Sequence, residues 1–115
     1  MPNKGREGEA LAVSHLEKKG ILILKKNFRS RKGEIDIIAL ENQTIIFAEV
    51  KTWSSYGIEN LEYAIDDKKR HKIIETSKYF LSLHREYKYM AIRFDVIFVS
   101  PKGITHLASA FAEGV

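Results

Sequence analysis

Two stretches of the chain are almost wholly apolar and predict two neighbouring β-strands. Residues 33–40 and 44–51 are rich in β-branched and aromatic side chains, and a polar break over residues 41–43 separates them. Strands as apolar as these usually lie inside a sheet that is covered on both faces. Charged residues nevertheless lie inside them, among them Asp36, Glu49 and Lys51.

The same kind of pattern predicts the rest of the fold. Helical spacing or strand alternation indicates five further elements, which are helices over residues 6–19 and from Asp66 or Asp67 to Leu83, and strands over residues 21–28, 90–99 and 104–108. The order α-β-β-β-α-β, with one short extra strand, predicts a single α/β domain over residues 1–115. In this domain a central mixed sheet is flanked by helices.

The register of the two apolar strands can be predicted from the turn between them. A tight hairpin centred on residues 42–43 pairs positions whose numbers add up to about 85. Asp36 then lies opposite Glu49 and Glu34 lies opposite Lys51, with Cβ atoms about 5 Å apart on one face. We therefore expect these charges to converge, provided that the register does not slip by one residue.

Two opposed carboxylates repel each other, and burying either of them without a partner costs free energy. A hard divalent cation removes both problems, because Mg²⁺ is typically held by one or two carboxylates and several waters. The alternative is a solvated patch in which Lys51 neutralises the acids. The apolar surroundings favour a site for Mg²⁺ or Mn²⁺ at Asp36 and Glu49, with the carbonyl oxygen of Val50 as a further ligand.

The pattern G-E-I-D-I-I-A followed by F-A-E-V-K resembles the bacterial YraN-like (UPF0102) proteins, and the resemblance extends over residues 5–99. Those proteins are grouped with the restriction-endonuclease-like nucleases, whose signature is D…E-x-K, and are distantly similar to archaeal Holliday junction resolvases. The resemblance implies a restriction-endonuclease-like core and metal-dependent hydrolysis of DNA phosphodiester bonds. Because phosphate contacts carry little sequence information, we expect a structure-selective or non-specific enzyme.

The resemblance also implies roles for single residues. Lys51 would orient the attacking water or help to deprotonate it. Residues 5–10 resemble the G-E-x-x-A helix of the family, whose glutamate reaches towards the metal site in resolvase-like enzymes, so Glu9 is expected in the active centre. The alternative for Glu9 is a carboxylate that only stabilises a helix start. Trp53 stands where the family usually has arginine, and it either stacks on a base or sugar or fills the side of the core.

Basic residues gather at two places that are expected to contact DNA. Arg31 lies in the turn 29–33, directly before the acidic strand. Four more occupy the first turns of the second helix, where cations oppose the helix macrodipole, and these are Lys68, Lys69, Arg70 and Lys72. An external anion would explain the cluster, and an ordinary solvated charge run is the alternative. Lys69 matches a lysine or arginine of the family.

Composition narrows the remaining choices. The formal charge of +4 fits a polyanionic partner without requiring one, and the absence of cysteine excludes disulfides and a thiol nucleophile. The four histidines lack metal-ligand spacing. No apolar signal region or membrane-length run is present, so we expect a cytoplasmic protein without a membrane partner.

The preferred partner is branched or single-stranded DNA, and a homodimer would suit a junction substrate. Two other functions stay open. One is a non-catalytic nucleic-acid-binding module on a nuclease-like fold, and the other is an assembly domain whose acidic patch contacts a protein. Arg93 and Asp95, in the strand over residues 90–99, are interpreted as structural polar residues of the sheet rather than as catalytic residues.

Overall fold

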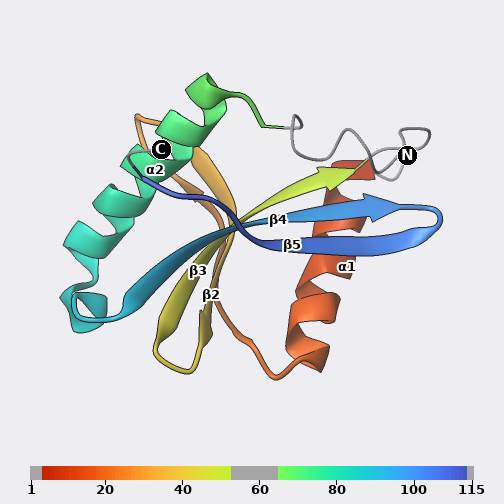
Figure 1. Cartoon of the computed structure of the whole chain (residues 1–115), viewed down its shortest axis with the longest axis horizontal. Helices are drawn as coiled ribbons and strands as arrows, with labels where there is room; N and C mark the ends of the chain where they lie inside the picture. The colour runs from red at the N-terminus through yellow and green to blue at the C-terminus, as the bar shows by residue number, and fades with distance from the viewer. Residues whose placement is uncertain (1–3, 53–64, 114–115) are drawn as a thin grey trace.

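The protein folds into a five-stranded mixed sheet with one helix on each face, as Figure 1 shows. The computed structural model describes residues 4–52 and 65–113, and Trp53 lies outside this part of the chain. The elements follow the order α1 (Lys4–Lys18), β1 (Leu22–Arg29), β2 (Glu34–Glu41), β3 (Thr44–Thr52), α2 (Asp67–Leu83), η2 (Arg85–Tyr87), β4 (Ala91–Ser100) and β5 (Gly103–Phe111).

This order confirms the predicted α/β class, and it is consistent with a restriction-endonuclease-like core. The last strand is longer than expected, since it runs over Gly103–Phe111 rather than over residues 104–108. The short 3₁₀ helix η2 was not predicted. No helix in the described ranges is both long and apolar enough to cross a membrane.

The strands lie side by side in the order β1-β2-β3-β4-β5, so β1 is an edge strand, and its exposed Lys25 and Lys26 suit that position. Neighbouring strands are antiparallel except for β3 and β4, which are parallel. A parallel pair needs a long crossover connection, and α2 lies within this one. The carboxyl-terminal ends of β3 and β4 therefore lie at the same end of the sheet.

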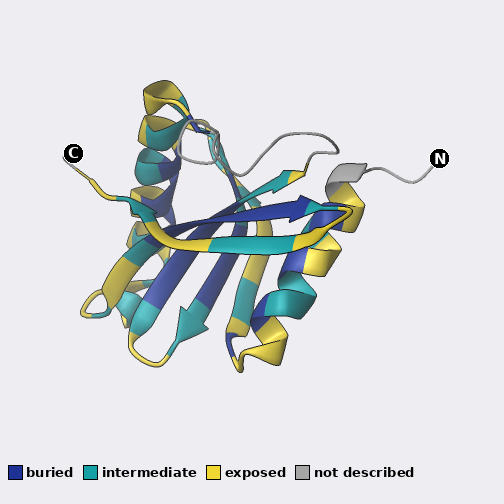
Figure 2. Ribbon diagram, turned by 45° about the vertical axis from the view of Figure 1, so that its right-hand side comes forward, coloured by how far each residue is buried: buried dark blue, intermediate teal, exposed yellow. Residues whose placement is uncertain are grey.

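Both faces of the sheet are covered, which explains why the central strands are almost continuously apolar. Alternate residues of the three central strands supply the buried residues of the two cores, and the interiors of these strands are dark blue in Figure 2. On the α1 side the core includes Ala12, Leu16, Ile37, Ile46, Ala48 and Ile97. On the α2 side it includes Ile45, Phe47, Ile73, Phe80, Phe94, Val96 and Phe98.

A glycine lets α1 approach the end of β3. Gly8 is buried, and a Cβ atom at this position would collide with the side chain of Thr52. Because Gly8 has no side chain, the first turns of α1, which carry Glu9, can lie against the end of β3, the strand that carries Glu49 and Lys51.

Candidate metal centre

The predicted hairpin register is confirmed through most of its length. Paired residues of β2 and β3 run from Glu41 opposite Thr44 to Ile37 opposite Ala48, and the numbers in each pair add up to 85. The ladder ends there, one pair before Asp36. Residue Glu34 is paired with Arg29 of β1 instead, at an ion-pair distance of 3.4 Å, rather than with a residue of β3.

The side chain of Asp36 lies in the gap that opens where the ladder ends. Its Oδ2 atom accepts a hydrogen bond of 2.8 Å from the backbone N–H of Val50. In a strand the N–H and C=O groups of one residue face the same neighbouring strand. We therefore expect the carbonyl oxygen of Val50 to face the same gap, as a further ligand would require.

Glu49 meets Asp36 at this gap. The pKa of Glu49 is raised to about 9. Burial is the largest cause, a hydrogen bond with Asp36 and the charge of Asp36 add to it, and Lys69 offsets part of the increase. Two carboxylates this close repel each other when both are ionised, which is why the contact with Asp36 raises the pKa of Glu49. The expected meeting of the two acids is present in the structure.

One oxygen of Glu49 is left without a hydrogen bond. The residue is only 5% exposed, and its buried Oε2 atom has no hydrogen-bond partner among the described residues. Lys69 Nζ lies 3.4 Å away, which is an ion-pair distance without hydrogen-bond geometry. A buried carboxylate oxygen of this kind favours an additional cation.

Glu9 approaches Asp36 from α1, on the opposite face of the sheet from α2. Burial raises the pKa of Glu9, and so do the charges of Asp36 and Glu34, while a hydrogen bond from Asn27 opposes the increase. Asn27 adopts a left-handed backbone conformation with φ of 54°. Asp36 thus has one carboxylate on each side of the sheet, Glu9 on the α1 side and Glu49 on the α2 side.

This donor set fits a lightly held hard cation better than an all-protein cage. Across residues 4–52 and 65–113, no group of three or more His, Cys, Asp or Glu side chains is arranged to hold a metal. Asp36 and Glu49, with the carbonyl of Val50, match the way Mg²⁺ is usually bound, since it keeps several waters. The buried, unsatisfied oxygen of Glu49 is the observation that supports the fit.

Lys51 lies at the end of β3, two residues beyond Glu49 and on the same side of the sheet. It is half-buried, and its backbone position is opposite Phe98 of the parallel neighbour β4. The structure therefore brings together Asp36, Glu49 and Val50, with Lys51 further along the same side of β3 and Glu9 close to Asp36 on the α1 side.

The basic turn is attached to α2. Ser30 Oγ donates to Thr76 Oγ1 at 3.5 Å, and a Cβ atom at Gly33 would lie 3.3 Å from Lys72 Cβ, so the turn and the helix are in close contact. Arg31, in the same turn, is exposed. The two basic groups that the sequence places far apart therefore form one surface.

The basic residues in the first turns of α2 contact different parts of the protein, since Lys69 points to Glu49 whereas Arg70 points to Ile65 and Phe111. The helix begins after Asp66, whose Oδ1 accepts from the N–H of Lys69 at 2.8 Å, and the side chain of Lys69 reaches Glu49. Arg70 is held elsewhere, because its Nε donates to the carbonyl of Ile65 at 3.0 Å and its guanidinium lies over the ring of Phe111. Lys68 is exposed.

The titration of Glu49 gives a stability test that does not depend on activity. A pKa raised above the unfolded value means that ionisation of Glu49 destabilises the fold. The stability that comes from its protonated side chain is therefore fully present below about pH 4.5 and is lost as the pH rises to about 9. We expect Glu49→Gln to be more stable than the wild type by roughly 2 kcal/mol at pH 8 and by much less at pH 5. Asp36 and Lys69 are the charged groups that face it.

Chemical denaturation with a chelator present would measure this difference. Glu34→Gln is the matched control, because Glu34 is partly exposed and paired with Arg29. A Glu49→Gln variant with the same stability advantage at both pH values would contradict the expected burial of the acid.

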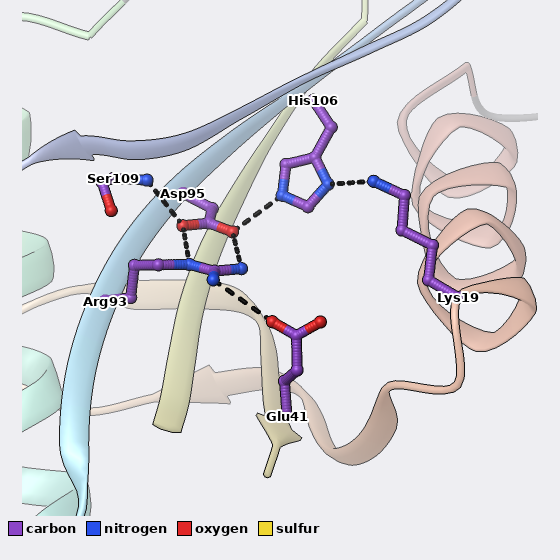
Figure 3. Close-up of polar contacts among 6 residues, drawn as sticks. All are labelled: Lys19, Glu41, Arg93, Asp95, His106 and Ser109. Carbon is purple, nitrogen blue, oxygen red and sulfur yellow. Dashed lines mark hydrogen bonds and ion pairs between the residues drawn. The ribbon is translucent and has the colours of Figure 1, made fainter. Parts of the chain in front are cut away.

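A second polar cluster lies within the sheet on the α1 side, as Figure 3 shows. Asp95 is fully buried and forms two bonds of 2.9 Å with the guanidinium of Arg93. His106 Nε2 lies 2.7 Å from its Oδ2, and the N–H of Ser109 donates to its Oδ1 at 3.0 Å. Burial alone would raise the pKa of Asp95, but the hydrogen bonds from His106, Arg93 and Ser109 lower it below its ordinary value.

The cluster extends to two further elements. Arg93 Nη1 donates to Glu41 at 3.2 Å, and Lys19 Nζ lies 3.3 Å from His106 Nδ1. The interpretation of Arg93 and Asp95 as polar residues within the sheet agrees with these contacts. Sequence reasoning missed His106, because only the pairing of β4 with β5 reveals that it faces Asp95.

The fold and the site together define an α/β protein in which a buried glutamate meets a half-buried aspartate where β2 and β3 separate, beside a basic helix start. This chain belongs to the family described as "Uncharacterised protein family UPF0102", whose profile matches residues 8–99.

Relatives that are more than 40% identical to this chain cover nearly its whole length. A UPF0102 protein of Persephonella marina is 47% identical over 108 residues, which covers 94% of this chain and 92% of that protein. A UPF0102 protein of Treponema denticola is 42% identical over 127 residues and covers 98% of both chains. A third, from Thermodesulfovibrio yellowstonii, is 42% identical over 108 residues, covering 93% of this chain and 94% of that protein.

Proposed function

We propose that this protein is a metal-dependent endonuclease that hydrolyses phosphodiester bonds in DNA, with selectivity for structure rather than for sequence. The observation that supports it best is the contact between Asp36 and Glu49, where a buried carboxylate oxygen of Glu49 lacks a hydrogen bond. Among the described residues this oxygen has only the ion pair with Lys69, at 3.4 Å and without hydrogen-bond geometry, whereas most buried carboxylate oxygens also accept a hydrogen bond.

The residues of the gap have different roles in the proposed reaction. Asp36 and Glu49, with the carbonyl of Val50, hold Mg²⁺ or Mn²⁺. Such a cation, when bound, acts as a Lewis acid on a phosphoryl oxygen and lowers the pKa of water. Lys51 orients the attacking water and stabilises negative charge on the phosphorus oxygens. Glu9 accepts a hydrogen bond from water on the α1 side of Asp36.

The basic surface beside the gap holds the DNA backbone. Arg31 belongs to the turn that contacts α2, and Lys69 and Lys72 follow on one side of that helix. Lys68 adds exposed positive charge, whereas Arg70 supports the surface from its position over Phe111. Contacts of this kind bind phosphates with little regard to sequence, and they weaken as salt is added.

Incubation of the purified protein with branched, single-stranded and duplex DNA tests the proposal. We expect cleavage of at least one substrate with Mg²⁺ or Mn²⁺ and none with a chelator. If no substrate is cleaved with either metal, the basic surface remains and favours the second candidate, a non-catalytic nucleic-acid-binding module.

A further inference from the structure

We propose that the exposed ring of Tyr79, together with the basic turn over residues 29–33, forms a binding platform for single-stranded nucleic acid. The inference rests on the proposed function, because it names the form in which the same site receives its substrate. Three observations support it, which are a row of residues on one side of α2, the packing of the Tyr79 ring and the positive charge on that side of the helix and on the turn that it contacts.

The row consists of Lys69, Lys72, Thr76 and Tyr79, whose alternating spacing of three and four residues places them on one side of α2. Its members lie against three parts of the chain beside the helix, which are β3, the turn between β1 and β2, and β1 itself. Lys69 reaches Glu49, Lys72 and Thr76 contact the turn at Gly33 and Ser30, and Tyr79 meets Phe28 of β1.

The row connects the carboxylate gap to the aromatic ring. Ten residues of α-helix separate Lys69 from Tyr79, which corresponds to about 15 Å along the helix axis. That is the reach of a few nucleotides of a single strand. A strand whose phosphate lies at the gap can therefore place a base beside Tyr79.

The ring of Tyr79 is supported from the protein side and is open to solvent. Its centroid lies 6.1 Å from that of Phe28 at an interplanar angle of 32°, and Phe28 in turn packs edge-on against Phe80 at 5.2 Å. Nevertheless Tyr79 is 46% exposed. An aromatic ring held by the core with a free surface is a good stacking partner for an unpaired base.

Positive charge lies on the same side of α2 and on the turn that this side contacts. Lys72 of the row is exposed, and so are Arg31 and Lys32 of the turn. Aromatic rings alongside cations match a single strand, which presents base faces and phosphates together. In a duplex the base faces are stacked on one another, so only the charges could contribute.

Fluorescence anisotropy with a labelled oligothymidine of about ten nucleotides, in chelator without added metal, tests the platform. We expect Tyr79→Ala to weaken single-strand binding roughly tenfold or more, because stacking of one base contributes that much. Tyr79→Phe should stay within about twofold of the wild type, since the ring remains. Binding of a duplex of equal length should not change in either variant.

Tyr89→Ala is the matched control. Tyr89 is 90% exposed and has Lys88 at 4.8 Å from its ring, but it lies beyond the end of α2 and outside the row. It should bind as the wild type does. The platform is refuted if Tyr79→Ala retains wild-type affinity, if it loses duplex binding equally, or if Tyr79→Phe is as weak as Tyr79→Ala.

The absence of metal separates this result from the nuclease proposal. Loss of single-strand binding in Tyr79→Ala supports the platform even if the wild type cleaves nothing. Cleavage by the wild type together with unchanged binding in Tyr79→Ala rejects the platform and leaves the nuclease proposal standing. Circular dichroism of each variant confirms that it is folded before it is compared.

Discussion

Asp36→Asn is expected to lower metal-dependent DNA cleavage at least about 100-fold while DNA binding changes by less than about threefold. The asparagine oxygen can still accept the hydrogen bond from Val50 N–H, so the gap between the strands keeps its shape. What is lost is the negative charge that a divalent cation needs. Single-turnover cleavage and anisotropy on the same DNA would measure the two effects separately.

Lys51→Ala should show a similar loss of cleavage by a different route. Because this lysine is assigned to the water and the phosphate, Mn²⁺ affinity measured by electron paramagnetic resonance should not fall. Lys102→Ala, at an exposed lysine of the turn between β4 and β5, is the control for lost charge alone. Wild-type cleavage by Asp36→Asn would reject the assignment of the metal centre.

Asp95→Ala is expected to lower the free energy of unfolding by about 3–5 kcal/mol. Asp95 is fully buried, and the change removes the partner of Arg93, of His106 and of the N–H of Ser109 at once. Uncompensated polar groups in the interior cost far more than a surface ion pair contributes. Denaturant titration would measure the loss.

Glu41→Ala provides the matched control within the same cluster. Glu41 also contacts Arg93, at 3.2 Å, but its side chain is 37% exposed. Removing it should cost less than about 1 kcal/mol. Equal losses for the two variants would show that burial does not set the strength of this cluster.

The hairpin could be predicted from the sequence because two apolar strands and a short polar turn leave few registers open. Its end could not be predicted. A regular ladder would continue to the pair of Asp36 and Glu49, but the side chain of Asp36 takes the N–H of Val50, and the paired residues stop at Ile37 and Ala48. Strand periodicity describes backbone pairing, and it does not show a side chain competing for a backbone donor.

The Asp95 cluster illustrates a different limit. Arg93 and Asp95 are two residues apart on one strand, so their contact follows from local spacing. Ser109 of β5 joins them only because the pairing of β5 with β4 shifts its register opposite Phe94 and Val96 of β4. Ser109 also adopts a left-handed backbone conformation, with φ of 53°. A bulge of this kind depends on the whole sheet, and nothing in the local composition announces it.

The parallel pairing of β3 with β4 sets a time order for assembly. The antiparallel β1–β2–β3 meander closes through short turns, whereas Thr44 meets Ala91 only after the entire crossover has been brought back. Contacts between residues near in sequence are generally made sooner than distant ones. The bond between Asp36 and Val50 should thus precede the pairing of β4 with β3, so during refolding the Val50 amide would gain protection from hydrogen exchange ahead of the β4 amides that pair with β3.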